Sequence, residues 1–288
     1  MQDSKPSVSV LGLGLLGASL CMELEGKYLR TGWSRNPENR RKAAERGIVD
    51  FQAETPEEAF AAGDIVVLCL PVPVITEYIR KYAGFLRPGA VLTDIGSVKG
   101  VIEEAAQSVP GLHFVGSHPM AGTEKNGIDN AFKGLYSRAD VFIVPPAGAA
   151  EQDILAVENL WKSIETRTTR LDSLAHDKLV AGTSHVPHIL ASATVLSVLD
   201  VPEQERPVRF SGCATGFRDS SRIASSSAAM WREIVEQNVP SVLSALDSLR
   251  KHLDEYELLI RNGNFDGFER KFARGKALRD EWIRWKKY

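Results

Sequence analysis

Short apolar runs alternate with longer amphipathic segments through the first 170 residues of the chain. Apolar runs of this length, bounded by glycine and polar residues, are typical of buried strands. They cover residues 7–11, 28–33, 65–70, 91–94, 114–117 and 141–144, with 168–171 as a candidate last strand. Helix signals lie between them, as at Thr55-Pro56-Glu57-Glu58, which offers an N-cap and a proline in the first turn. The alternation predicts a mostly parallel, doubly wound α/β sheet.

The pattern changes after Leu171, where β-branched runs give way to long helical periodicity. Residues 180–198 are apolar over much of their length, which predicts a helix that is buried all round. Residues 233–260 and 265–285 carry apolar side chains at spacings of three and four, as amphipathic helices do. We therefore predict an all-α domain over residues 172–288.

Composition excludes several classes of partner. The chain has 288 residues, 43% of them hydrophobic and 25% charged, with a formal net charge of −2. A nearly neutral chain of mixed charge gives no reason to expect nucleic acid or an anionic membrane as partner. The three cysteines form no CxxC pair, so we expect reduced thiols in a cytosolic protein rather than disulfides or a zinc site.

The chain begins with a polar segment, and its apolar runs are short. A predicted strand follows Met-Gln-Asp-Ser-Lys-Pro directly, so we expect no signal peptide. The longest apolar runs are of strand length, so we also expect no transmembrane span. Together these features predict a cytoplasmic protein.

The first predicted strand leads into Gly12-Leu13-Gly14-Leu15-Leu16-Gly17, a G-x-G-x-x-G motif with a strand before it and a helix after it. The first glycine permits a tight turn, the second lets the backbone approach a pyrophosphate, and the third lets helix and sheet pack closely. Amide groups of the helix N-terminus, near Leu15 and Leu16, would then face the phosphates. Residues 1–171 are thus predicted to form a Rossmann-like dinucleotide-binding domain.

The second predicted strand ends at Trp33-Ser34-Arg35-Asn36. Sites specific for NAD usually carry Asp or Glu here, and that carboxylate would repel a 2′-phosphate. Ser34 is uncharged, and Arg35 can bind a 2′-phosphate through charge-assisted hydrogen bonds. We predict NADP in preference to NAD; the alternative is that Arg35 is a solvated loop residue. Arg40 and Arg41 either extend the basic pocket or lie on a helix surface.

Two further loops follow predicted strands. Leu70-Pro71-Val72-Pro73 would border the cofactor, and its prolines keep it stiff. Asp94-Ile95-Gly96-Ser97-Val98-Lys99 follows the fifth strand and would place Ser97 near the nicotinamide. The alternative role of Ser97 is to cap the next helix.

The run Ser117-His118-Pro119-Met120-Ala121-Gly122-Thr123-Glu124 places a histidine where the sixth strand is expected to end. Open α/β sheets bind ligands at the carboxyl ends of their strands. An imidazole with an unperturbed pKa of about 6.5 is largely neutral near pH 7 and can accept a proton. The run predicts proton transfer beside a redox cofactor; the alternative is a structural histidine bonded to backbone.

With Thr183-Ser184-His185-Val186-Pro187-His188 and Gly216-Phe217-Arg218-Asp219-Ser220-Ser221-Arg222, these motifs resemble the prephenate/arogenate (cyclohexadienyl) dehydrogenases of tyrosine biosynthesis. The motifs occur in the expected order over nearly the whole chain. The glycine motif is common to many enzymes, whereas the histidine-containing run and the Gly-Phe-Arg-Asp-x-x-Arg run are far more specific.

The resemblance implies a small-molecule substrate, a cyclohexadiene with a hydroxyl at C4 and a carboxylate on the opposite ring carbon. Hydride leaves C4 for the nicotinamide while the carboxylate leaves as carbon dioxide, giving tyrosine from arogenate or 4-hydroxyphenylpyruvate from prephenate. It also implies a homodimer built by the helical domain. The choice between the two substrates and inhibition by tyrosine stay open; Ser34 and Arg35 favour the arogenate-preferring branch that uses NADP.

The resemblance assigns roles to particular residues. His118 would accept the proton of the C4 hydroxyl, and Ser97 would be a second partner of that hydroxyl. Arg222 would bind a substrate carboxylate as a bidentate pair. Further expected substrate contacts are Thr123, Glu124, Ser184, His188, Arg218 and Trp231. Arg218 otherwise contacts a neighbouring chain or is a surface charge, Glu124 orders its loop or gates the pocket, Asp219 orients an arginine, and His185 is structural.

Two other interpretations of the sequence stay open. An NADP-dependent β-hydroxyacid dehydrogenase or imine reductase would also pair a Rossmann half with a helical half, but it generally uses a lysine in the long helix. The comparable segment here offers Ser184, His185 and His188. A dinucleotide-sensing protein without turnover would keep the glycine motif but would not need His118 and Arg222 together.

Overall fold

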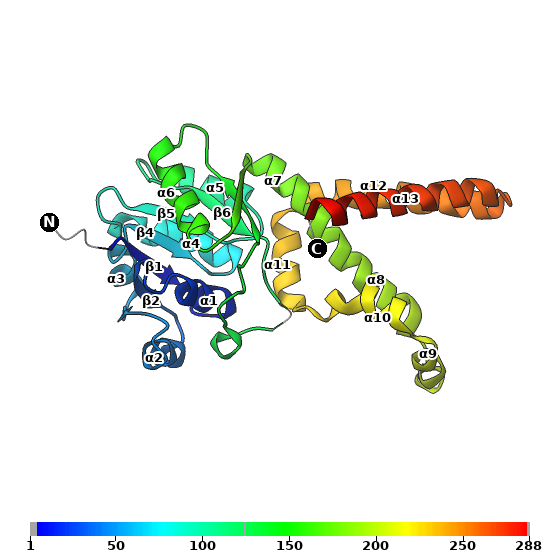
Figure 1. Cartoon of the computed structure of the whole chain (residues 1–288), viewed down its shortest axis with the longest axis horizontal. Helices are drawn as coiled ribbons and strands as arrows, with labels where there is room; N and C mark the ends of the chain where they lie inside the picture. The colour runs from blue at the N-terminus through cyan, green and yellow to red at the C-terminus, as the bar shows by residue number, and fades with distance from the viewer. Residues whose placement is uncertain (1–4, 124, 287–288) are drawn as a thin grey trace. The chain divides into compact units, whose positions relative to one another are not determined.

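The computed structural model describes residues 5–123 and 125–286 (Figure 1). Within these residues a sheet of five parallel strands has the order β3-β2-β1-β4-β5. Its strands are β1 (Ser7–Leu11), β2 (Leu29–Trp33), β3 (Phe51–Gln52), β4 (Ile65–Leu68) and β5 (Val91–Asp94). The order places the first strand at the centre, and it confirms the predicted Rossmann-like, doubly wound sheet.

A second sheet contains β6 (Gly116–Pro119), β7 (Asp140–Val144) and β8 (Arg167–Arg170). β6 pairs antiparallel with β7, and β7 pairs parallel with β8. The strand predicted at residues 114–117 begins two residues later, because Phe114 bridges to Leu92 of β5 before the chain pairs with β7. His118 therefore lies opposite Phe142 at the carboxyl end of β6, one residue before the strand ends at Pro119 and not just beyond it.

Period-two alternation along the strands gives the larger sheet two hydrophobic cores. Val8 and Val10 face one core, and Leu11 faces the other. The first core is completed by α1 (Leu15–Glu23), α2 (Pro37–Glu45) and α6 (Glu151–Lys162). The second is completed by α3 (Pro56–Ala61), α4 (Val72–Tyr82) and α5 (Gly100–Gln107). The sheet is therefore covered on both faces, as parallel sheets require.

The predicted start of α3 is confirmed. The Thr55 side chain accepts a hydrogen bond from the backbone N–H of Glu58 at 3.2 Å, and Pro56 opens the helix. The Glu58 carboxylate accepts in turn from the backbone N–H of Glu54 at 2.8 Å. Local sequence thus fixes where this helix begins.

The second half of the chain is mainly helical, and its first group of helices ends at Gln237. Its elements are α7 (Ser173–Val180), a π-helical turn (Ala181–His185), α8 (Val186–Leu199), α9 (Arg206–Gly212), α10 (Thr215–Ser221) and α11 (Ala228–Gln237). The prediction of a helix buried all round over residues 180–198 was wrong. In α8 Val186 and Ala191 are buried, whereas Leu190 and Leu196 are exposed in the single chain. Other elements of this chain cover part of the helix surface and leave an apolar remainder.

One segment contradicts the expectation that apolar runs are of strand length. Among the described residues, Ser173–Leu199 is long and apolar enough, by length and composition alone, to cross a membrane. This segment contains α7, the π-helical turn and α8, and it includes His176, Asp177 and His185. Their side chains bond to α5, β6 and the end of α11, so the segment packs as part of the folded protein.

Two compact units divide the chain, Met1–Val239 and Pro240–Tyr288. The second contains nearly all of α12 (Val239–Arg261) together with α13 (Phe265–Lys286). These two helices form a hairpin in which the rings of Tyr256 and Phe268 are 5.3 Å apart. The periodic segment predicted at residues 233–260 is interrupted at Asn238, whose φ of −134° and ψ of 32° are not helical.

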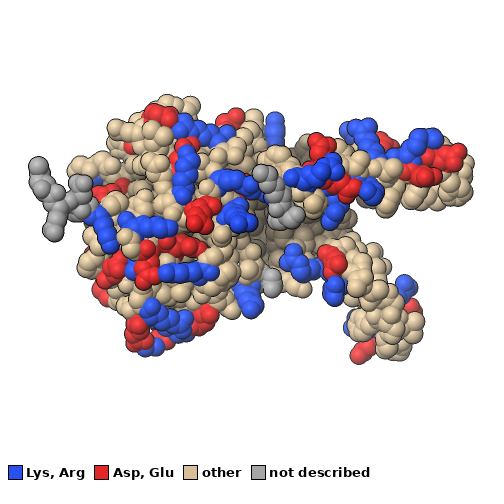
Figure 2. Space-filling model, viewed as in Figure 1, with Lys and Arg blue, Asp and Glu red and all other residues tan. Residues whose placement is uncertain are grey.

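Charges of both signs are mixed over the face shown in Figure 2. This agrees with the nearly balanced composition. No large area of one sign is visible on that face.

Candidate active site

The turn after β1 has the geometry of a dinucleotide cradle. Gly12 has a φ of +106°, and a Cβ on it would lie 2.1 Å from the carbonyl oxygen of Cys69. A Cβ on Gly17 would lie 2.0 Å from the carbonyl oxygen of Gly12. At Gly14, the N-cap of α1, a Cβ would meet nothing within 4 Å. The outer glycines therefore permit the turn and the packing, while Gly14 leaves open space at a helix N-terminus, as a bound pyrophosphate requires.

An exposed cation, Arg35, follows the end of β2. Ser34 is buried and Arg35 is exposed, and Arg35 has no ion pair within residues 5–123 and 125–286. Arg40 donates to the carbonyl oxygen of Ser34 at 2.7 Å and pairs with Glu54 at 3.3 Å. Arg41 instead pairs with Glu38 and Glu45 on the surface of α2. Arg40 thus supports this loop, and Arg41 belongs to the helix surface.

The loops after β4 and β5 lie as the motifs indicated, with one correction. Leu70 is close to the glycine turn, since a Cβ on Gly12 would lie 3.0 Å from its Cδ2, and Pro71 is the N-cap of α4. Ser97 is half-buried in the loop after β5, and its hydroxyl has no hydrogen bond to any described residue. Ser97 does not cap α5. Asp177 does so, because its carboxylate accepts from the backbone N–H groups of Lys99 and Gly100.

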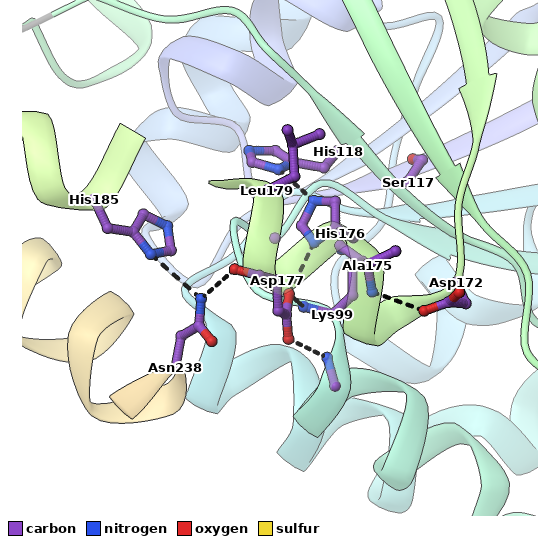
Figure 3. A network of polar contacts seen from close by, with 12 residues as sticks. Lys99, Ser117, His118, Asp172, Ala175, His176, Asp177, Leu179, His185 and Asn238 are labelled. Carbon is purple, nitrogen blue, oxygen red and sulfur yellow. Dashed lines mark hydrogen bonds and ion pairs between the residues drawn. The ribbon is translucent and has the colours of Figure 1, made fainter. Parts of the chain in front are cut away.

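A chain of polar contacts joins His118 to α7 (Figure 3). Nδ1 of His118 is 2.9 Å from Nε2 of His176, and Nδ1 of His176 is 2.8 Å from Oδ1 of Asp177. His118 is 8% exposed and His176 is fully buried. Asn238 donates to the carbonyl oxygen of Asp177 at 2.9 Å and lies 3.4 Å from Nδ1 of His185. These contacts bring together residues from β6, α7, the π-helical turn and the end of α11, which are far apart in the sequence.

Burial and neighbouring groups keep His118 neutral. Burial, followed by His176, Lys99 and His185, lowers the pKa of His118 well below 6.5. Lys99 is itself buried, 1% exposed, and forms an ion pair with the buried carboxylate of Asp94. Burial lowers the pKa of Lys99, and the Asp94 carboxylate opposes that effect. A neutral imidazole at this position can accept a proton at neutral pH.

The helical side of the site gathers around Trp231. The ring of His188 lies 3.9 Å from that of Trp231, and Nδ1 of His188 donates to the carbonyl oxygen of Ser184 at 2.9 Å. A mainly apolar cavity of about 410 Å³ opens beside these rings and is lined by residues of α8 and α11 together with Ile223 and Ala224. Burial lowers the pKa of His188, the hydrogen bond to the Ser184 carbonyl opposes that effect, and the Arg222 guanidinium lowers the pKa further.

Several expected contacts lie apart from these clusters. Arg218 is 73% exposed and pairs with Asp219 at 3.0 Å. Thr123 is exposed, and its side chain accepts from the backbone N–H of Lys125 at 3.2 Å. Neither Arg218 nor Thr123 has a hydrogen bond to His118 or His188 in the described part of the chain. Glu124 lies outside the described residues.

Sequence reasoning missed the residues that support His118. His176 and Asp177 lie in α7 and Asn238 follows α11, they form no recognised motif, and His176 is 58 positions from His118. The available signal was an adjacent histidine and aspartate inside a helical run that is apolar over much of its length. Such a pair in a buried segment requires polar partners, although the sequence does not say which.

Comparisons with known proteins agree with this arrangement. Residues 22–170 match the model of the prephenate dehydrogenase nucleotide-binding domain, and residues 172–274 match that of the prephenate dehydrogenase dimerization domain. The chain is 32% identical over 278 residues to a prephenate dehydrogenase of Lactococcus lactis, which covers 94% of this chain and 76% of that protein. It is 28% identical over 276 residues to a cyclohexadienyl dehydrogenase of Zymomonas mobilis, which covers 94% of each.

Solved structures extend the likeness to the whole fold. The prephenate dehydrogenase of Aquifex aeolicus in complex with hydroxyphenyl propionate and NAD+ has a TM-score of 0.89 at 29% identity, covering 98% of this chain and 99% of that one. The arogenate dehydrogenase of Synechocystis has a TM-score of 0.85 at 28% identity, covering 96% and 100%. Because both domain models match in order and these relatives span nearly all of it, the chain belongs to the prephenate dehydrogenase family of oxidoreductases.

Proposed function

We propose that this protein catalyses the oxidative decarboxylation of arogenate, prephenate or both, with NADP as the preferred hydride acceptor. The observation that carries the proposal is a neutral, nearly buried His118 whose pKa is lowered in part by Lys99, two residues from the half-buried Ser97, in a chain whose glycine turn fits a dinucleotide. The products would be tyrosine or 4-hydroxyphenylpyruvate, together with carbon dioxide. A bound nicotinamide would supply the acceptor for the hydride that leaves C4.

His118 would handle the proton of the C4 hydroxyl. Its lowered pKa keeps the ring unprotonated, so it can accept that proton as the C4–H bond breaks. The electron pair of the bond to the leaving carboxylate enters the ring, and the proton returns to the oxygen as the ring becomes aromatic. The Ser97 hydroxyl, which has no partner among the described residues, is available to bind the same oxygen.

The helical side would hold the anionic and side-chain parts of the substrate. Arg222 is a guanidinium close to His188, and a bidentate contact with a carboxylate would orient as well as bind the substrate. Ser184, His188 and Trp231 come together beside the apolar cavity and would contact the substrate side chain. Arg218, Thr123 and Glu124 remain proposed contacts of the bound substrate.

The preference for NADP rests on the end of β2. This strand is followed by Ser34 and Arg35 where an NAD-specific site usually carries an acid. Arg35 is exposed and has no ion pair among the described residues, so its charge is available to a 2′-phosphate. Arg40 donates a hydrogen bond to the Ser34 carbonyl oxygen in the same loop. The relative from Aquifex aeolicus was solved with NAD+, so cofactor choice in this chain needs its own measurement.

The remaining proposals concern organisation. The dinucleotide-binding domain would span residues 1–171. The helical domain would span residues 172–288, bind substrate and form a homodimer. Exposed apolar side chains on the helices support the dimer, among them Leu196, Leu243, Leu253 and Phe272. We also propose a cytoplasmic location, as expected from the sequence.

Steady-state kinetics with both substrates and both cofactors test this function. Formation of reduced cofactor, followed by absorbance, should be observed with arogenate or prephenate and should be faster with NADP than with NAD. Arg35→Ala should reduce kcat/KM for NADP by about 10- to 100-fold, since a charge-assisted contact is lost, and leave NAD nearly unchanged. Arg41→Ala, on the nearby helix surface, is the control. Absence of turnover with both substrates would refute the proposal.

A further inference from the structure

The contacts behind His118 determine which of its ring nitrogens carries the proton. His118 Nδ1 and His176 Nε2 are 2.9 Å apart, and His176 Nδ1 and Asp177 Oδ1 are 2.8 Å apart (Figure 3). A neutral imidazole has one N–H donor and one acceptor nitrogen. Each link of this chain therefore fixes the donor and acceptor in the next.

Asp177 is the acceptor at the end of the chain. Its Oδ1 accepts from the backbone N–H of Lys99 at 2.8 Å, and its Oδ2 accepts from the backbone N–H of Gly100 at 2.9 Å. These groups form the N-terminus of α5, where a negative charge is favoured. An ionised carboxylate only accepts hydrogen bonds, so Nδ1 of His176 must donate to it.

His176 must then accept from His118. Burial lowers the pKa of His176, and Lys99 lowers it further while Asp177 opposes both effects, so the ring is neutral near pH 7. With its proton on Nδ1, the Nε2 atom of His176 carries a lone pair. The 2.9 Å contact is therefore donated by Nδ1–H of His118.

We propose that His176 and Asp177 are positioning residues that hold His118 in the Nδ1–H tautomer and so leave its Nε2 atom as the proton acceptor. This inference rests on the proposed function for its purpose, but the tautomer itself follows from contacts within the chain. Neither residue needs to touch the substrate.

The charged groups around His118 are consistent with this role. Lys99 disfavours a positive charge on the ring, and the Asp94 carboxylate pairs with Lys99. When His118 takes up a proton, its Nδ1–H bond to His176 is kept, and His176 remains bonded to the Asp177 carboxylate. These hydrogen bonds therefore support both the neutral and the protonated form of His118 without rearrangement, as the orienting carboxylate of a catalytic triad does.

Nitrogen NMR of histidine-labelled wild-type protein, without substrate or cofactor, tests the tautomer directly. The signals of His118 are assigned by their loss in His118→Asn. We expect the proton of His118 on Nδ1 and a lone pair on Nε2 at neutral pH. A proton on Nε2 would overturn the proposal. Because no turnover is needed, this result is separate from any failure of the proposed function.

His176→Phe gives the second test. The substitution keeps a ring of similar size but removes the acceptor, and a buried N–H without a partner is costly. We expect the Nδ1–H population of His118 to fall, and kcat to drop by about 10- to 100-fold with cofactor affinity retained. His113→Phe breaks a second histidine–aspartate pair, in which His113 Nδ1 lies 2.7 Å from Asp153 Oδ2, and should change neither quantity. An unchanged tautomer and kcat in His176→Phe would contradict the proposal.

Discussion

The glycine turn after β1 and the hydrogen-bonded residues His118, His176 and Asp177, here called the histidine chain, are held in place by different kinds of contact. Close backbone packing fixes the turn, since a single added carbon at Gly17 would overlap the carbonyl of Gly12. Hydrogen bonds between buried polar groups fix the histidine chain, and they run through His118, His176 and Asp177. The turn should therefore be sensitive to added volume and indifferent to pH, whereas the histidine chain should be sensitive to protonation and to loss of a partner.

The largest expected effect comes from the catalytic end of the histidine chain. His118→Asn should lower kcat by about 10²- to 10⁴-fold, because it removes the proton acceptor. Binding of NADP, measured by calorimetry, should stay within about twofold of wild type, since the glycine turn is untouched. Unchanged turnover would remove His118 from the mechanism.

Two alanine substitutions separate the roles of the glycines. Gly17→Ala places a Cβ 2.0 Å from a backbone oxygen and should destabilise the fold by about 3 kcal/mol. Gly14→Ala meets nothing within 4 Å, so its stability should be close to that of wild type while its affinity for the dinucleotide falls. Urea unfolding and calorimetry measure the two effects. Equal stability losses in both variants would contradict the assigned roles.

Arg222→Ala should act on substrate rather than cofactor. Loss of a charge-assisted contact with a carboxylate should raise KM for the substrate by about 10- to 100-fold. The KM for NADP should be nearly unchanged, which steady-state kinetics would establish. Arg250→Ala, at an exposed residue that pairs with Asp247, is the control and should change neither KM. A larger rise in the KM for NADP than in the KM for the substrate would contradict the assignment of Arg222 to the substrate.

The smallest expected effect is the dependence of stability on pH. Burial lowers the pKa of His185 from 6.5 to about 4. As the pH falls below about 6.5, the unfolded chain binds a proton that the folded protein does not, so stability decreases. Between pH 7 and pH 5 this residue should account for a loss of about 2 kcal/mol. Urea unfolding at both pH values should show a smaller loss in His185→Gln; an equal loss would exclude His185 as a source.

The two regions also differ in how far sequence alone predicts them. The glycine turn, the central strands and the start of α3 depend on local patterns, and they formed as expected. Strand β3 was missed because Phe51–Gln52 is too short to show a period. The support of His118 was missed because it depends on contacts between residues 58 positions apart. Local rules do not encode such pairings.

The helical half shows a second limit of pattern. Apolar composition over residues 180–198 predicted complete burial, yet Leu190 and Leu196 are exposed in the single chain. Composition records how apolar a helix is and not what covers it. The break at Asn238 was likewise hidden by apolar residues that keep their spacing on both sides of it.

The pH dependence of kcat/KM for the substrate tests the central claim most directly, because it reports the free enzyme's proton acceptor. With the pKa of His118 lowered well below 6.5, kcat/KM should stay level as the pH falls from 7 through 6.5 and should decline only at lower pH. The residual activity of His118→Asn should lack that decline. A decline centred at or above pH 6.5 that persists in His118→Asn would contradict the account.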